Sequence, residues 1–250
     1  MHIVIVILAL VLLMVAAYRG YSVILFAPIA ALVAVLLTEP SALPPLFTGL
    51  FMEKMVGFLK LYFPVFMLGA VFGKLIELSG FSQAISASVI RFFGQRNAIL
   101  SIVLVCALLT YGGVSLFVAV FAVYPFAAEI FRGANIPKRL IPGTIALGAF
   151  TFTMDSLPGT PQIQNIIPTT FFGTNTWAAP ILGCLGGVFI LAVGMLYLDW
   201  RRRQAAAAGE GYGTGHAQEP EQVDASRLVH PLVAVVPLVV VGVSNFLYTR

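Results

Sequence analysis

The sequence predicts an all-α integral membrane protein, and three observations support this class. Of its 250 residues, 60% are hydrophobic and only 10% are charged, whereas about a quarter of a soluble domain is charged. The mean hydropathy is +0.99. The apolar residues also gather into runs, many of which approach the roughly 20 residues that a membrane-spanning helix needs. One soluble core could not bury this much apolar surface, so we expect the chain to fold in a lipid bilayer.

Seven apolar stretches are candidates for spans, and from them we expect about six to eight transmembrane helices. They cover about residues 2–18, 21–38, 55–79, 98–131, 140–155, 177–199 and 231–248. A cleaved signal peptide is the alternative for the first stretch. Because no Lys or Arg precedes its apolar run, as a signal peptide would require, we expect it to remain as the first transmembrane helix.

Basic residues separate these runs in short clusters, as in the cytoplasmic loops of membrane proteins. The clusters are Arg19; Arg91 and Arg96; Arg132, Lys138 and Arg139; and Arg201, Arg202 and Arg203. The net charge of +4 is therefore not a continuous basic face, and we expect no nucleic-acid partner. Successive spans cross the membrane in alternate directions. All of these basic clusters can lie in the cytoplasm only if stretch 98–131 begins and ends on the cytoplasmic side.

The stretch 98–131 is too long for one comfortable span and is broken at Thr110–Ser115. Gly112 and Gly113 each lower helix stability by about 1 kcal/mol relative to alanine. This predicts a helical hairpin, or a discontinuous pair of helices, that turns at the two glycines. Ser115 is then placed to cap the second arm. The alternative is one kinked helix whose glycines allow close packing.

The chain is expected to have three parts. Residues 1–203 form an N-terminal transmembrane repeat, and residues 230–250 form the first span of a second half. Between them, residues 204–229 are a long polar stretch rich in Gly, Ala and acidic residues, which is typical of a flexible cytoplasmic linker. A long linker followed by one span predicts that the chain is an N-terminal half or fragment of a longer protein.

A polar segment, Phe152–Trp177, interrupts the apolar pattern between two spans. Non-helical backbone at membrane depth is tolerated only where protein buries it or where it lines a watery cavity. Pro161 suits the first turn of a helix and Thr160 suits its N-cap, so we expect a short helix over 162–167 that ends at Pro168.

The start of that short helix is a candidate anion site. Its free N–H groups and positive dipole end favour a carboxylate, and Gly159 would allow a ligand to approach closely. Broken helices aim their N-termini at substrates in this way in transporters. The alternative is an extracellular Pro/Thr-rich loop without a site, although half of the residues in IQNIIPTTFF are apolar.

Two segments resemble one known family. The run TFTMDSLPGTPQIQNIIPTTFFGTNTWAAPILG (151–183) and the earlier GAVFGKLIELSGFSQAISASV (69–89) resemble the gluconate:proton symporter family (GntP-type permeases), with the D-beta-hydroxybutyrate permease branch looking nearest. This resemblance implies proton-coupled uptake of a small organic hydroxy acid across the bacterial cytoplasmic membrane. It also implies the fold of the ion transporter superfamily, two inverted repeats with helical hairpins. Family members are roughly twice as long, so this chain resembles one repeat.

The resemblance also matches two segments of this chain to the family's motifs. The family's LPGTPQ segment corresponds to Leu157–Gln162, and its first hairpin to the break at Gly112 and Gly113. The substrate-binding candidates are Ser156, Gly159, Thr160, Gln162, Gln164 and Asn165, together with Gly112, Gly113 and Ser115 at the hairpin. The helix N-terminus would hold the substrate carboxylate, and Ser156, Gln162, Gln164 and Asn165 its hydroxyls.

Asp155 is the candidate proton carrier. Many gluconate-type members have a small neutral residue before the Leu-Pro-Gly, where this chain has Asp155-Ser156. An acid beside a carboxylate substrate must be protonated, and burial favours the protonated form. The alternative is an aspartate at a helix end in the extracellular mouth.

Other function classes have less support. An enzyme would need a nucleophile–base pair or a metal cluster. The sequence has no G-x-S-x-G or H-E-x-x-H motif, and Cys106 and Cys184 lack metal-ligand spacing, so we expect no catalysis, no metal and no cofactor. A channel, and a truncated inactive half with only an assembly role, are further alternatives. The expected partners are an organic-acid anion, protons, the bilayer, and either a second copy or the missing C-terminal half.

Overall fold

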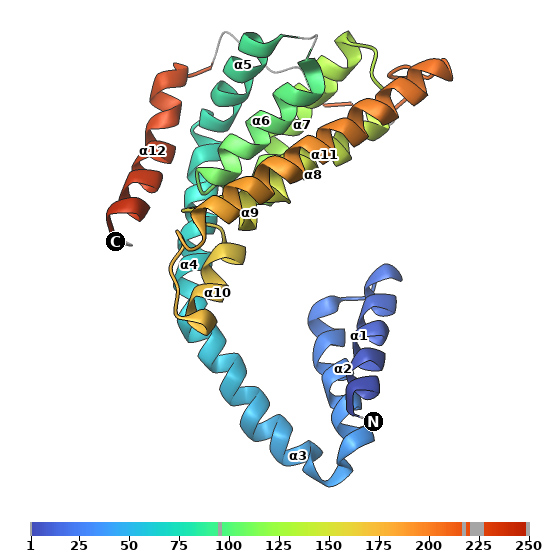
Figure 1. Cartoon of the computed structure of the whole chain (residues 1–250), viewed down its shortest axis with the longest axis vertical. Helices are drawn as coiled ribbons and strands as arrows, with labels where there is room; N and C mark the ends of the chain where they lie inside the picture. Colours follow the sequence, from blue (N-terminus) through green and yellow to red (C-terminus); the bar gives the residue numbers. More distant parts are fainter. Residues whose placement is uncertain (1, 95–96, 217–218, 221–227, 249–250) are drawn as a thin grey trace. The chain divides into compact units, whose positions relative to one another are not determined.

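The computed structural model describes residues 2–94, 97–216, 219–220 and 228–248 (Figure 1). All regular structure among these residues is helical, which confirms the predicted all-α class. The chain divides into two compact units, Met1–Pro64 and Val65–Arg250. The boundary between them falls within one helix, α4 (Met52–Leu78), which contains Pro64.

The first unit begins with a hairpin of two apolar helices. In it, α1 (His2–Tyr18) packs against α2 (Val23–Thr38), and Gly20 takes a φ of +81° in the turn between them. An irregular stretch then leads into α4, made of a 3₁₀ turn at Pro40–Ala42, the short α3 (Leu43–Pro45) and a π-helical segment at Leu46–Phe51. Its prolines lack the N–H that a regular helical ladder uses, which accounts for the irregularity.

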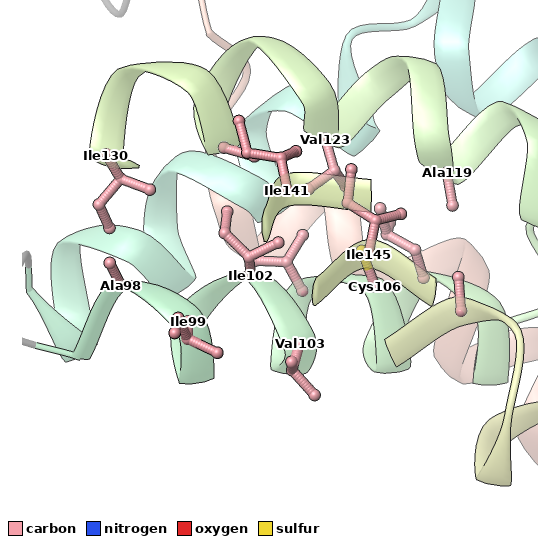
Figure 2. Packing of buried hydrophobic residues seen from close by; sticks show 14 of the residues in the cluster. Ala98, Ile99, Ile102, Val103, Cys106, Ala119, Val123, Ile130, Ile141 and Ile145 are labelled. Atoms are coloured by element: carbon pink, nitrogen blue, oxygen red, sulfur yellow. The ribbon is translucent and has the colours of Figure 1, made fainter. Parts of the chain in front are cut away.

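The core of the second unit is built around α6 (Ala98–Tyr111). This helix packs against α5 (Phe81–Phe93), α7 (Leu116–Gly133) and α8 (Ile141–Ala149). Figure 2 shows Ile102 and Cys106 of α6 packed with Ile141 and Ile145 of α8. Most of α6 is buried, as expected for a helix that is apolar all round.

Two longer helices complete the second unit. One is α11 (Pro180–Ala207), which packs beside α6 and α8, and the other is α12 (Pro231–Tyr248), which packs against α5 (Figure 1). Of the segment predicted as a linker, residues 204–207 extend α11, whereas residues 217–218 and 221–227 lie outside the described residues. The linker and the second half stay predictions.

The described part of that segment lies against the turn between α7 and α8, and we call residues 209–216 with Glu219 the strap. Tyr212 is only 6% exposed, and its backbone N–H donates to Asn135 Oδ1 over 3.1 Å. Arg139 binds Glu210 through two hydrogen bonds of 2.6 Å. Glu219 pairs with Arg132 and, at 2.9 Å, with Lys138 Nζ. The strap is thus held by one buried ring and two groups of ion pairs.

The helices have the lengths and surfaces of a multi-pass membrane protein. Among the described residues, the stretches Pro40–Leu78, Pro180–Ala207 and Pro231–Tyr248 are long and apolar enough to cross a membrane. Ile3–Tyr18, Val23–Thr38 and Ala98–Tyr111 are shorter apolar helices. On α11, large side chains such as Ile181 and Leu182 are more than 70% exposed, as lipid-facing residues are. The number of spans, six to eight, stays a prediction.

Candidate functional site

The first break in the second unit is the turn between α6 and α7. The hairpin interpretation is confirmed, because α6 and α7 are separate helices packed against each other. Gly113 has a φ of +90° in this turn, a conformation that favours glycine. Ser115 is the N-cap residue of α7, as predicted, but its side chain makes no capping hydrogen bond, so that part of the prediction is wrong.

The second break lies between α8 and α11. Here α9 (Phe152–Asp155) is followed by an extended loop, by α10 (Ile163–Phe172) and by a second loop. The predicted break is confirmed, but its details differ. The N-cap of α10 is Gln162 rather than Thr160, because Gln162 has extended backbone with ψ of 148°.

The predicted end of this helix at Pro168 is also wrong. Pro168 lies inside α10, which ends at Gly173 in the left-handed conformation, with a φ of +61°. A proline inside a helix removes one backbone hydrogen bond and strains the turn before it, but here the helix continues. Glycine adopts the left-handed conformation at little cost, and it therefore sets the end.

The two breaks are joined by hydrogen bonds. Gln162 Nε2 donates to the carbonyl oxygens of Thr110, at 2.7 Å, and Val114, at 3.2 Å. Tyr111 donates its hydroxyl proton to the carbonyl oxygen of Pro158, at 2.9 Å. The Thr110 carbonyl also accepts from the Gly113 N–H at 3.0 Å, so the Gln162 amide adds a side-chain bond at the end of α6. The structure therefore brings Gln162, one of the predicted site residues, to the glycine turn.

The loops that flank α10 are tied to each other as well. Asn165 Nδ2 donates to the carbonyl oxygens of Thr160 and Thr176, both at 3.0 Å, and the Gly159 N–H donates to Thr176 at 2.8 Å. Gly159 has a φ of +78°, and a Cβ there would overlap the Trp177 indole. The space beside Gly159, expected to admit a ligand, is thus taken by Trp177.

Two buried hydroxyls at the breaks have no hydrogen-bond partner among the described residues. They belong to Thr110, in the last turn of α6, and Thr160, in the loop before α10. Leaving a buried polar group unpaired costs about 1–3 kcal/mol, so such groups are commonly satisfied by water or ligand. Thr160 was predicted as a site residue, whereas Thr110 was identified only as the edge of the break.

The remaining predicted residues lie at the margin of this region. Ser115 and Ser156 are half-buried, and Gln164 and Asp155 are exposed. The Ser156 hydroxyl donates to Asp155 Oδ1 over 3.0 Å. The proton-carrying role of Asp155 stays a prediction, as do the binding roles of the other residues.

Sequence reasoning missed Asn245, which enters the site from α12. Its side chain bonds to Gly159, Thr176 and Trp177. The pattern that could have found it is a polar amide within the mostly apolar stretch VVVGVSNFLY, because polar residues inside membrane helices commonly bond across helices. Among the described residues, no group of three His, Cys, Asp or Glu side chains could hold a metal ion.

Comparison with known proteins identifies a relative. The chain is 60% identical over 258 residues to a Bacillus subtilis (strain 168) protein called "Uncharacterized transporter YxjC". The match covers the whole of this chain and 54% of the relative, so the chain is homologous to it along its full length and spans about half of it. No family model and no solved structure matches the chain.

Proposed function

We propose that this chain is part of a secondary active transporter that takes up a small organic hydroxy acid together with protons. Its support is the contact between the two breaks, where the Gln162 amide bridges the carbonyls of Thr110 and Val114. The homology to a protein named as a transporter points to the same class. The LPGTPQ segment, through its family resemblance, favours gluconate or 3-hydroxybutyrate as substrate.

The proposed substrate site lies near the N-termini of α7 and α10. The α7 N-terminus follows the glycine turn, and the α10 N-terminus follows the loop that contacts this turn. The first N–H groups of each helix have no partner within the helix, and the positive ends of both dipoles favour a carboxylate. The Thr110 and Thr160 hydroxyls add buried groups that can donate or accept a hydrogen bond. Asp155 is the proposed proton carrier.

The test is uptake into proteoliposomes under an inward proton gradient. The substrates are labelled 3-hydroxybutyrate, gluconate, glycerate and citrate, each with and without a protonophore. We expect saturable, protonophore-sensitive uptake of one acid. Thr160→Val removes an unpaired buried hydroxyl and should abolish this uptake. Thr169→Val is the matched control, because the Thr169 hydroxyl already bonds to Ile166 of its own helix at 2.7 Å. Equal uptake by the two variants would refute the site.

A second candidate is a half-transporter. In this case the chain transports only when it is combined with a second half that corresponds to the rest of its relative. The observation that favours it is the 54% coverage of that relative. In the same assay, uptake would then require co-reconstitution with the remaining half. Uptake by this chain alone would exclude this alternative.

A further inference from the structure

One side chain of α12, that of Asn245, bonds to both loops of the second break. Asn245 Nδ2 donates to the Gly159 carbonyl oxygen over 3.1 Å. Its Oδ1 accepts from the Thr176 hydroxyl at 3.1 Å and from Trp177 Nε1 at 3.3 Å. The same amide therefore holds the loop that precedes α10 and the loop that follows it.

The same helix covers the glycine turn at the first break. Leu238 lies where a side chain on Gly112 would have to go, and Val241 lies 3.5 Å from the position of a Cβ on Gly113. Phe246 packs edge-on against Trp177, with ring centroids 5.3 Å apart. Leu238, Val241 and Asn245 follow the spacing of one helix face, so one face of α12 contacts both breaks.

An amide suits this position because it donates and accepts at once. Gly159 offers a carbonyl, which needs a donor, whereas Trp177 and Thr176 offer donors, which need an acceptor. An aspartate would keep the acceptor and lose the donor. A leucine would lose both and leave these groups unpaired where water is scarce.

We infer that Asn245 is a positioning residue of the proposed binding site. Through Gly159 and Trp177 it fixes the loop that carries Thr160, and with it the start of α10. This inference rests on the proposed function, because it assigns α12 to the same site. It adds that the site needs a helix beyond the strap, and that Asn245 acts without touching the substrate.

The first test needs no substrate. The chain has two tryptophans, Trp177 and Trp200, so in a Trp200→Phe background the fluorescence reports on Trp177 alone. Asn245→Leu should shift the Trp177 emission, whereas Asn245→Asp, which keeps the acceptor, should shift it less. The neighbouring half-buried hydroxyl supplies a control, Ser244→Ala, which should leave the emission unchanged.

The second test measures the loop itself. Thr160→Cys, in a background with Cys106→Ala and Cys184→Ala, places a thiol at a fully buried position. Both Asn245→Leu and Asn245→Asp remove the donor to Gly159 and should raise the rate of maleimide labelling by about tenfold, the equivalent of one hydrogen bond. Because Asn245→Asp keeps the polarity of the position, it serves if the leucine variant does not fold.

Three results decide the inference. A faster labelling rate in both variants, with a shifted Trp177 emission in Asn245→Leu, supports it even if no acid is transported, in which case only the proposed function fails. In a transporting protein, Asn245→Asp should raise KM by about tenfold with little change in kcat. Unchanged labelling, or an unchanged KM, would overturn the positioning role.

Discussion

At the scale of single residues, position 112 requires glycine because Leu238 leaves no room for a side chain, and not because of its backbone conformation. Its φ is −72°, an ordinary value, but a Cβ at this position would overlap the Leu238 side chain. The glycine therefore makes room for α12. Gly113, one residue on, has the opposite requirement, because its φ is positive.

Gly112→Ala should therefore destabilise the protein, since overpacking of this kind costs about 1–3 kcal/mol. Leu238→Ala should recover part of that loss when combined with it, and the two changes should not be additive. Thermal unfolding in detergent measures both. Gly242→Ala is the control, because nothing lies within 4 Å of a Cβ there. Additive effects of the two substitutions would show that the contact with Leu238 is not the reason why position 112 is a glycine.

At the residue scale, prediction from sequence failed where a side chain bonds to a residue that is far away in the sequence. Thr160 and Pro161 have the local chemistry of a helix start, but α10 begins after Gln162, whose amide bonds to the end of α6. Local preferences hold no information about that partner. For the same reason Asn245 was missed, because its bonds reach residues about 70 to 85 positions earlier.

At the scale of elements, the strap is held by ion pairs whose strength depends on pH. The hydrogen bond from Arg139 lowers the pKa of Glu210 below its ordinary value of 4.5, and that from Lys138 does the same for Glu219. A carboxylate whose pKa is lower in the folded state stabilises that state fully above its ordinary pKa. This stabilisation of the folded state is lost as the pH falls through the lowered pKa of the carboxylate.

The strap should therefore remain docked at pH 7 and loosen below about pH 4. A nitroxide label on the exposed residue 214, introduced as Thr214→Cys, reports this as faster motion in its spin-resonance spectrum. At pH 7, Glu210→Gln combined with Glu219→Gln should give the mobile spectrum, and high salt should act in the same direction because the pairs are exposed. A spectrum that stays immobile in the double variant would assign the docking to Tyr212 alone.

Helices and breaks were predictable at this scale because composition marks them. Long apolar runs locate α1, α2, α4 and α12 to within a few residues, and the two glycines locate the turn after α6. The run at 177–199 also locates α11, but this helix continues to Ala207. The strap was not predictable in this way. Its residues are polar and glycine-rich, which is typical of a flexible linker, and its order comes from Tyr212 and from basic residues near the turn after α7.

At the scale of the whole molecule, α11 gives a test of orientation. Its 28 residues span about 42 Å at 1.5 Å per residue, more than the roughly 30 Å of a bilayer core. Its ends should therefore lie on opposite sides. The arginines at 201–203 predict that its C-terminal end faces the cytoplasm, and the strap follows directly from that end.

In cells, a thiol at position 174 should therefore react with an impermeant reagent added outside, and a thiol at position 214 only after permeabilisation. Both are introduced in place of exposed threonines in the background lacking Cys106 and Cys184. Labelling efficiency measures the outcome. If both positions react from the same side, α11 does not cross the membrane, and the predicted topology is wrong.

The contacts of α12 also set an order of events during synthesis. The turn at Gly112 and the loop at Gly159 leave the ribosome well before Leu238 and Asn245, which later cover and bind them. While the chain is still growing, both breaks therefore lack these partners, however well the preceding helices have packed. The contacts that cover and bind the two breaks are completed only when residues 231–248 have been made, so they depend on the last described helix to be synthesised.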